Sequence, residues 1–452
     1  TVAILDAGVV VEQSVVSRRA RMNGLNIWLR PQEGAGGTIR IDVYPEGGEA
    51  PLVSRSVPVR DFPGNELAIS FPPLEDPPGT GYRLRLAAED GPIAVLGRGE
   101  DLYPHGAASV NNAPAEADLA FRLSYEYGPG AVLEDIWRAL GALPAAIPLL
   151  LVVWLPGWLI LEASGLSREL DWGERMAAAI GLSGTALAVL LVWTTAFGIA
   201  WSRAGAWVLA GGLGLAGGWR LYRSLRRRLF ERPVMLFRPG SLATAAALAG
   251  VFVLALGVRL AMVRDLAAPP WVDSVHHGMI ARMIADSGRL PASYAPYVST
   301  GLSQYHSGFH VQLAFFHWLS GFGMDTALLV LGQVLNALMI FAVYLFTTTL
   351  IRSRTAGIAA ALIAGLLTPM PAYYTSWGRY TQLAGLLVLP TALALALRLI
   401  DARAGEGKRL RWLVGLTGLA GGGLFLIHYR VCLLYTSPSP RDRTRSRMPS
   451  SA

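Results

Sequence analysis

Two hydrophobic patterns divide the chain. Over the first 131 residues, apolar and polar side chains alternate in short runs, whereas the remainder consists of long apolar blocks separated by short polar loops. Alternation with a period of two predicts half-buried β-strands, and an apolar block of about 20 residues can cross the hydrocarbon of a bilayer. The sequence therefore predicts a β domain followed by an all-α polytopic membrane domain.

The predicted strands are short and closely spaced. Gly- and Pro-rich turns separate them, which is typical of an all-β sandwich. No cluster of potential ligands stands out in residues 1–131, so carbohydrate binding and a passive spacer both stay open and no site is assigned. The clearest strands are 25–30, 38–44, 82–87 and 119–125, with weaker candidates at 9–16 and 93–98.

Eight apolar blocks are predicted to span the membrane, and no internal repeat relates them. The block at 204–221 is rich in glycine, and the block at 355–371 is short for a span. The eight blocks are 141–162, 176–198, 204–221, 242–263, 325–350, 355–371, 382–400 and 411–428.

Arginine in the loops predicts which side faces the cytosol. The loop 219–240 carries seven arginines, and 352–354, 401–411, Arg168 and Arg175 add further positive charge. If the blocks simply alternate in direction, all these loops lie on one side, and positively charged short loops stay cytoplasmic. The β domain, the long loop 264–324, the loop 370–382 and the stretch 428–430 are then extracytoplasmic.

The two ends change the interpretation of the composition. Residues 432–452 resemble a translated sequencing adapter and are predicted to be non-native. They hold the only cysteine and contribute three of the eight net positive charges, so nucleic-acid binding is not expected. Thr1 opens within a predicted strand, so the N-terminus is expected to be truncated. Because the β domain is predicted to lie outside and precedes the first span, a signal peptide or a further span is expected before it.

Four segments follow from these patterns. They are an N-terminally truncated β domain at 1–131, three spans with a basic loop at 132–241, a core at 242–431 and the non-native tail at 432–452.

The long loop 264–324 concentrates the candidate chemistry, because five of the seven histidines lie in it. Residues 272–286 are predicted to form an amphipathic helix with Asp273, His276 and His277 near its start. The stretch 307–320 is apolar but too short to span, so we expect it to lie in the interface or to dip back.

A membrane enzyme family shows the same order of elements. The fourth block, the sequence WVDSVHH at 271–277, the sequence YHSGFH at 305–310 and the fifth block follow one another. In this order, region 242–431 resembles the polyprenol-dependent glycosyltransferases of the GT-C superfamily, which include protein mannosyltransferases and bacterial aminoarabinose transferases. In the mannosyltransferases a glutamate follows the aspartate directly, whereas Ser274 stands here.

The resemblance implies a reaction, a location and an acid. A sugar would pass from a polyprenyl phosphate to a glycan, lipid or protein acceptor on the extracytoplasmic face of a bacterial plasma membrane. Asp273 would act as general base or orient the acceptor, a role that contributes about 10²–10⁴-fold.

Candidate substrate groups lie around this acid. The departing lipid phosphate needs cations, for which Arg379 and Arg430 are the main candidates and Arg259 a third. Trp377 and Tyr380 are candidates for a sugar-stacking face, and His276 or His277 for orienting substrate or ion.

A metal stays an open alternative. His306 and His310 stand four residues apart, a spacing that suits substrate binding or one metal ion. The spacing supplies no third ligand, so no residue is assigned to a metal, although a divalent ion stays possible in this superfamily.

Each assignment has an alternative. Asp273 can simply favour a helix start, the aromatic residues can form an interfacial belt and Arg259 can snorkel. Gln333 and Asn336 are expected to be interhelical hydrogen-bonding residues. A transporter or lipid-linked glycan carrier, and a non-catalytic cell-envelope scaffold, remain the competing functions.

Overall fold

The computed structural model describes most of the chain in two compact units. The first unit is Thr1–Ile136 and the second begins at Trp137. The described residues are 1–436 without 34, 63, 90, 100–102, 142, 231–238, 265, 267, 271, 298–304 and 403–406. Part of the predicted basic loop, Trp271 and most of the predicted adapter tail therefore lie outside the described residues.

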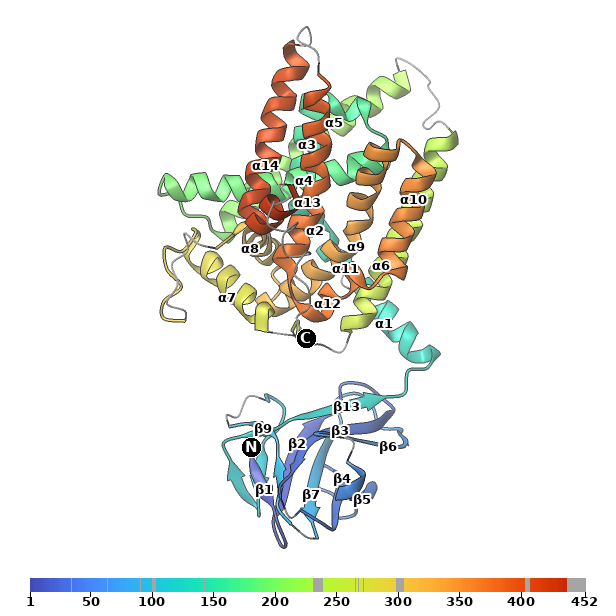
Figure 1. Cartoon of the computed structure of the whole chain (residues 1–452), viewed down its shortest axis with the longest axis vertical. Helices are drawn as coiled ribbons and strands as arrows, with labels where there is room; N and C mark the ends of the chain where they lie inside the picture. Colours follow the sequence, from blue (N-terminus) through green and yellow to red (C-terminus); the bar gives the residue numbers. More distant parts are fainter. Residues whose placement is uncertain are drawn as a thin grey trace, which may run out of the picture. The chain divides into compact units, whose positions relative to one another are not determined.

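The first unit contains two antiparallel sheets around one hydrophobic core (Figure 1). One sheet has the order β1-β8-β3-β13, with β6 also paired to β3, and the other has the order β11-β10-β2-β7-β4-β5. A short pair, β9 and β12, completes the strands. Their bounds are β1 Ala3–Leu5, β2 Val10–Val16, β3 Met22–Pro31, β4 Thr38–Pro45, β5 Val53–Pro58, β6 Glu66–Leu74, β7 Gly81–Ala88, β8 Ile93–Val95, β9 Gly97–Arg98, β10 Ala108–Val110, β11 Ala113–Ala115, β12 Asp118–Leu119 and β13 Phe121–Tyr125.

Alternation along the strands builds this core. In β7, Tyr82, Leu84 and Leu86 are buried while the residues between them are more exposed, as the pleat of a strand requires. Core residues from both sheets form one cluster, so the sheets pack face to face as a sandwich. The predicted strands are confirmed, and the sequence analysis missed β5, β6, β10 and β11.

The second unit is helical (Figure 1). The predicted helix at 272–286 is confirmed as α7, and the apolar stretch at 307–320 forms α8. After α1 Pro129–Gly141, which crosses the boundary between the units, the helices are α2 Ala146–Val153, α3 Leu155–Ser164, α4 Trp172–Ala196, α5 Arg203–Phe230, α6 Pro239–Val263, α7 Val272–Ser287, α8 Gly308–Ser320, α9 Met324–Ile351, α10 Arg354–Leu362, α11 Pro369–Ala372, α12 Tyr374–Trp377, α13 Tyr380–Ile400 and α14 Gly407–Thr436, with a π-helical turn, η5, at Ile363–Leu367.

Five of the described helices are long and apolar enough to cross a membrane. They are α4, α9 and α13 together with Leu242–Val263 of α6 and Gly407–Leu433 of α14. Among the other predicted blocks, the first is broken into α2 and α3 at Trp154, and the sixth is a shorter apolar helix, Arg354–Leu367. The chain is therefore a multi-pass helical membrane protein with at least five segments of spanning character.

Helix α8 is enclosed by protein rather than laid on a surface. Its residues from Gly308 to Phe316 are all buried, and it packs against α2, α4, α5, α7, α9, α13 and α14. The sequence allowed two positions for this stretch, in the membrane interface or dipping back. A position in the interface, with one face of the helix exposed, is therefore wrong. Because α7 packs on α8, this buried helix fixes the position of the histidine-rich segment.

A buried polar network joins α6 to the segment 363–380. Arg259 is almost completely buried, and its Nε donates to Asn336 Oδ1 at 2.8 Å while its Nη2 donates to the Gly365 carbonyl at 2.7 Å. Thr375 Oγ1 donates to Gln333 Oε1 at 2.9 Å. Gln333 and Asn336 are thus confirmed as interhelical hydrogen-bonding residues, and Arg259 neither snorkels nor offers a free guanidinium to a phosphate.

Candidate functional site

The structure brings the predicted acid and one predicted arginine into contact. Asp273 lies in the first turn of α7, and its Oδ2 accepts from Arg379 Nε at 3.2 Å. Both side chains are about two-fifths exposed, at 39% and 44%. A carboxylate and a guanidinium that remain open to solvent can each still contact a ligand.

A tight turn positions Arg379. Gly378 ends α12 with a φ of +66°, and Arg379 follows as the N-cap residue of α13. A Cβ on Gly378 would lie 2.1 Å from Ser274 Oγ, which itself donates to the Pro270 carbonyl at 2.8 Å. Residue 378 must therefore be glycine both for its left-handed backbone and for its close approach to α7.

Only one of the two predicted aromatic platforms is accessible. Trp377 is partly buried, and the Arg379 guanidinium lies 3.9 Å from its ring centroid. Tyr380 is completely buried, and its hydroxyl accepts from Gln333 Nε2 at 3.1 Å. Tyr380 therefore does not face a bound sugar, because its ring is packed against Gly332 inside the helical unit.

Two predicted histidines form a buried pair. His277 Nδ1 lies 3.1 Å from His310 Nε2, which joins α7 to α8. Burial lowers the pKa of His277 to about 3, and the neighbouring His276 acts in the same direction. Burial also lowers the pKa of His310 well below its usual value. Both rings are therefore neutral near pH 7, with one donating and the other accepting the shared proton.

His306 extends this imidazole cluster toward α14. Its ring stacks on Tyr305, with centroids 4.2 Å apart, and lies 4.4 Å from the ring of His428. Both ring nitrogens of His306 are buried, and neither has a hydrogen-bond partner within the part of the chain that the structure describes. Burial lowers the pKa of His306 to about 3, and nearby positive charge, including Arg430, acts in the same direction.

Arg430 and Asp273 act on the same tyrosine. Burial raises the pKa of Tyr305, the charge of Asp273 raises it further and the charge of Arg430 lowers it. The predicted acid, both predicted arginines, His277, His306 and His310 therefore belong to one neighbourhood, around the start of α7, the end of α12 and the break in α14.

Two histidines of the loop stand apart from this cluster. His276 is exposed on α7, so it can contact a ligand only from solvent. His317 Nδ1 lies 2.7 Å from the Phe322 carbonyl at the end of α8, which gives it a local structural role. Among the described residues, no group of three or more His, Cys, Asp or Glu side chains is placed to hold a metal ion. We therefore assign no residue to a metal.

The comparisons with known proteins place the helical unit in a family. A family model described as "Family of unknown function (DUF6541)" matches residues 150–435, which is more than half of the chain. The chain belongs to the DUF6541 family. No curated protein matches it. The DUF6541 match begins within α2, reaches into α14 and includes the whole candidate site, and it leaves the β unit outside.

The DUF6541 match also bears on the predicted tail. Both the match and α14 continue past Val431, to 435 and to Thr436 respectively, so neither marks a boundary at residue 432.

Sequence reasoning missed two residues of the site, Tyr305 and His428. Each is adjacent to a residue that was considered, since Tyr305 precedes His306 and His428 lies two positions before Arg430. The contribution of His428 depends on a break in α14, because this residue has a φ of −163° and a ψ of 93° inside that helix. A helical pattern in the sequence does not reveal such a break.

Proposed function

We propose that this DUF6541 protein is a membrane glycosyltransferase that transfers a sugar from a polyprenyl-phosphate donor to an acceptor on the extracytoplasmic face. The observation that supports it most is the partly exposed pair of Asp273 and Arg379 beside Trp377. It combines, within a few ångströms, a carboxylate for a hydroxyl, a guanidinium for a phosphate and an aromatic ring.

Asp273 acts as the general base in this proposal. An acceptor hydroxyl attacks the anomeric carbon of the donor sugar, and its proton passes to the carboxylate of Asp273. The bond between the anomeric carbon and the phosphate oxygen breaks, and its electron pair leaves with the lipid phosphate. Arg379 holds Oδ2 of Asp273 and so leaves the other carboxylate oxygen for the acceptor.

Arg379 and Arg430 stabilise the charge that develops on the leaving phosphate. Both side chains are exposed, and both come from segments at the same end of the helical unit as α7. A guanidinium offers several N–H donors in a planar fork, so Arg379 can keep its contact with Asp273 while it binds a phosphate oxygen. Arg379 lies over the Trp377 ring, so in this proposal the sugar packs against the part of Trp377 that remains exposed.

The proposal includes a topology. Eight crossings, by α2–α3, α4, α5, α6, α9, α10–η5, α13 and α14, put the arginine-rich loops in the cytosol of a bacterium and the candidate site outside. The positions of the arginines support this arrangement, because the arginine-rich loops all fall on one side if the eight segments alternate in direction.

The test is an assay with purified protein in proteoliposomes and a radiolabelled polyprenyl-phosphate sugar. Asp273→Asn removes the base while it keeps the size of the side chain, and transfer is expected to fall by about 10²-fold or more. The matched control is Asp286→Asn on the same helix, where the side chain is exposed, and it should retain activity. Transfer by Asp273→Asn at the wild-type rate would refute the role of Asp273.

A transporter or carrier of a lipid-linked glycan is the second candidate. Irregular helix geometry in three of the proposed crossings favours it, at Trp154 between α2 and α3, in the π-helical turn η5 and at His428, because discontinuous helices are typical of transporter binding sites. The same proteoliposomes distinguish the two, since a carrier moves the labelled lipid across the bilayer without releasing its sugar.

A further inference from the structure

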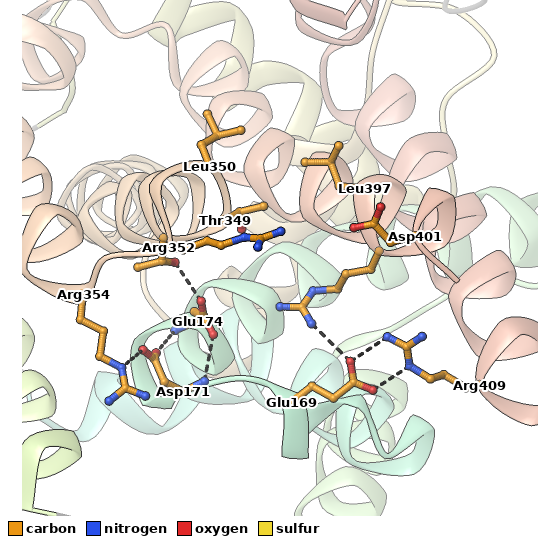
Figure 2. Close-up of a pocket in the computed structure, with 12 residues that line it drawn as sticks. Glu169, Asp171, Glu174, Thr349, Leu350, Arg352, Arg354, Leu397, Asp401 and Arg409 are labelled. Carbon is orange, nitrogen blue, oxygen red and sulfur yellow. Dashed lines mark hydrogen bonds and ion pairs between the residues drawn. The ribbon is translucent and has the colours of Figure 1, made fainter. Parts of the chain in front are cut away.

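A second cavity lies at the opposite end of the helical unit from Asp273. It has a volume of about 770 Å³ and is formed where α4, α10 and α14 begin and where α9 and α13 end (Figure 2). Four carboxylates and four guanidinium groups line it. In total the charges balance, so what the cavity can bind depends on which of these groups are already engaged.

Glu169 is fully engaged by two arginines. Arg409 donates to it through Nε at 2.8 Å and through Nη2 at 3.0 Å, and Arg398 Nη1 donates to Oε2 at 3.3 Å (Figure 2). The hydrogen bond from Arg409 is the main reason that the pKa of Glu169 is lowered. Two guanidinium groups on one carboxylate leave this part of the wall with an excess of positive charge.

Asp171 and Glu174 are engaged as well, and mostly by neutral donors. They form a capping box at the start of α4, in which each side chain accepts from the backbone N–H of the other residue. Asp171 Oδ2 also accepts from Tyr344 at 2.6 Å and from Arg354 at 3.2 Å. Glu174 Oε1 accepts from Thr348 at 2.9 Å. These carboxylates hold the helix ends together and have little capacity left for a ligand.

The groups of the cavity wall that are not used in these contacts are mainly hydrogen-bond donors. Arg352 lines the cavity, and no carboxylate pairs with it among the residues that the structure describes. Arg354 and Arg398 each use one nitrogen in their ion pairs and keep further N–H groups. The buried Oγ1 of Thr349 has no hydrogen-bond partner in the described part of the chain. A ligand in this cavity would therefore contact unused hydrogen-bond donors and positive charge.

The backbone of Arg352 points to the same conclusion. It ends α9 with a φ of +57° and a ψ of 30°, a left-handed conformation that usually falls to glycine at the end of a helix. Glycine would adopt this conformation with less strain. The presence of arginine here is therefore explained by a role of its side chain, such as binding a ligand in the cavity. Figure 2 shows this side chain beside Thr349 in the cavity.

We propose that this cavity binds a phosphate ester that carries hydroxyl groups, with the phosphate on Arg352 and the Thr349 hydroxyl. A phosphate offers several acceptor oxygens to the unused N–H groups, and guanidinium binds it in a bidentate manner. Asp401 is the remaining carboxylate and is exposed at the wall, where it accepts from a hydroxyl of the same ligand. The ligand is either a glycerophosphate lipid headgroup or a soluble phosphate ester.

Two probes distinguish these sources. Binding of sn-glycerol 3-phosphate to protein in phosphatidylcholine nanodiscs is followed by tryptophan fluorescence. Retention of phosphatidylglycerol is followed by native mass spectrometry of protein from mixed nanodiscs. Saturable binding of either probe is expected, and the probe that binds identifies the source.

Substitutions at Arg352 then test the site. Arg352→Gly and Arg352→Gln are each expected to weaken binding by about tenfold or more, because a charge-assisted bidentate contact is lost. Arg352→Gly should melt at the same or a higher temperature than the wild type, because it relieves the left-handed backbone. This result would separate lost binding from lost folding.

The matched control is Arg168→Gln, an exposed arginine next to Glu169 that does not line the cavity. It should bind within about twofold of the wild type. The proposal is overturned if neither probe binds saturably, or if both Arg352 variants bind as the wild type does. The site is independent of sugar transfer, so its failure would leave the role of Asp273 untouched.

Discussion

His277 and His310 share a hydrogen bond across the contact between α7 and α8, with Nδ1 and Nε2 3.1 Å apart. Asp273 lies one helical turn before His277 on the same face of α7, because residues four apart are neighbours along a helix. The buried pair therefore fixes the helix that presents the candidate acid. Sequence spacing alone suggested a different partnership, with His306 and His310 on one ligand.

This pair predicts that acid destabilises the helical unit. The unfolded state binds protons on its histidines below about pH 6.5, whereas His277 resists protonation down to about pH 3 in the folded state. Its contribution to the free energy of unfolding is thus present above pH 6.5 and is lost progressively as the pH falls toward 3. Between pH 6.5 and 5 the loss is about 2 kcal/mol for one such histidine, measurable as a lower melting temperature in detergent.

The variant His277→Gln isolates this effect. It removes one titrating ring, so its melting temperature should fall less steeply between pH 7.5 and 5 than that of the wild type. His276→Gln, on the same helix but exposed, should keep the wild-type slope. Parallel slopes for all three proteins would show that the buried pair does not control the response to acid.

The fold was predictable where the hydrophobic pattern was regular. Period-two alternation identified β2, β3, β4 and β7, and the amphipathic pattern placed α7 within one residue of its end. The membrane class followed from apolar length alone. Strand β5 was missed because its residues from Ser54 to Ser56 are all exposed, so it carries little alternation.

The site was predictable as a set of residues but not as a geometry. Arg259 illustrates the limit, because an arginine in an apolar block can snorkel, bind a ligand or satisfy buried acceptors. Arg259 satisfies buried acceptors because Asn336 and the Gly365 carbonyl lie beside it, and Gly365 is 106 positions from Arg259 in the chain. The cavity around Arg352 was missed because three of its four arginines were interpreted only as a topology signal and Arg398 lies inside a predicted span. The three arginines that pair with Glu169 or Asp171 come from three different helices, α10, α13 and α14.

The close contact of Gly378 with Ser274 predicts a strong effect of one added methyl group. Gly378→Ala introduces a left-handed alanine, which costs about 1–2 kcal/mol, and also forces its Cβ against Ser274 Oγ. Overpacking of this kind adds about 1–3 kcal/mol. The melting temperature in detergent should therefore fall, and sugar transfer should fall with it, because the start of α7 moves away from Arg379.

Gly198→Ala is the control for the backbone term. Gly198 also has a positive φ, of +74°, but an added Cβ there meets no atom within 4 Å. It should lower the melting temperature by clearly less than Gly378→Ala does. Equal losses would mean that Ser274 moves aside at little cost and that this contact does not position α7.

The proposed topology makes a prediction about accessibility from each side of the membrane. Cys432 is the only cysteine, so Cys432→Ser gives a cysteine-free background. On this background Tyr297→Cys, exposed in the histidine-rich loop, should react in intact cells with a maleimide that cannot cross the membrane. Arg168→Cys, exposed in the loop before α4, should react only after the membrane is permeabilised, because that loop belongs to the arginine-rich side. The reverse pattern would put Asp273 in the cytosol, where the proposed acceptors are absent, and would remove the basis for extracytoplasmic sugar transfer.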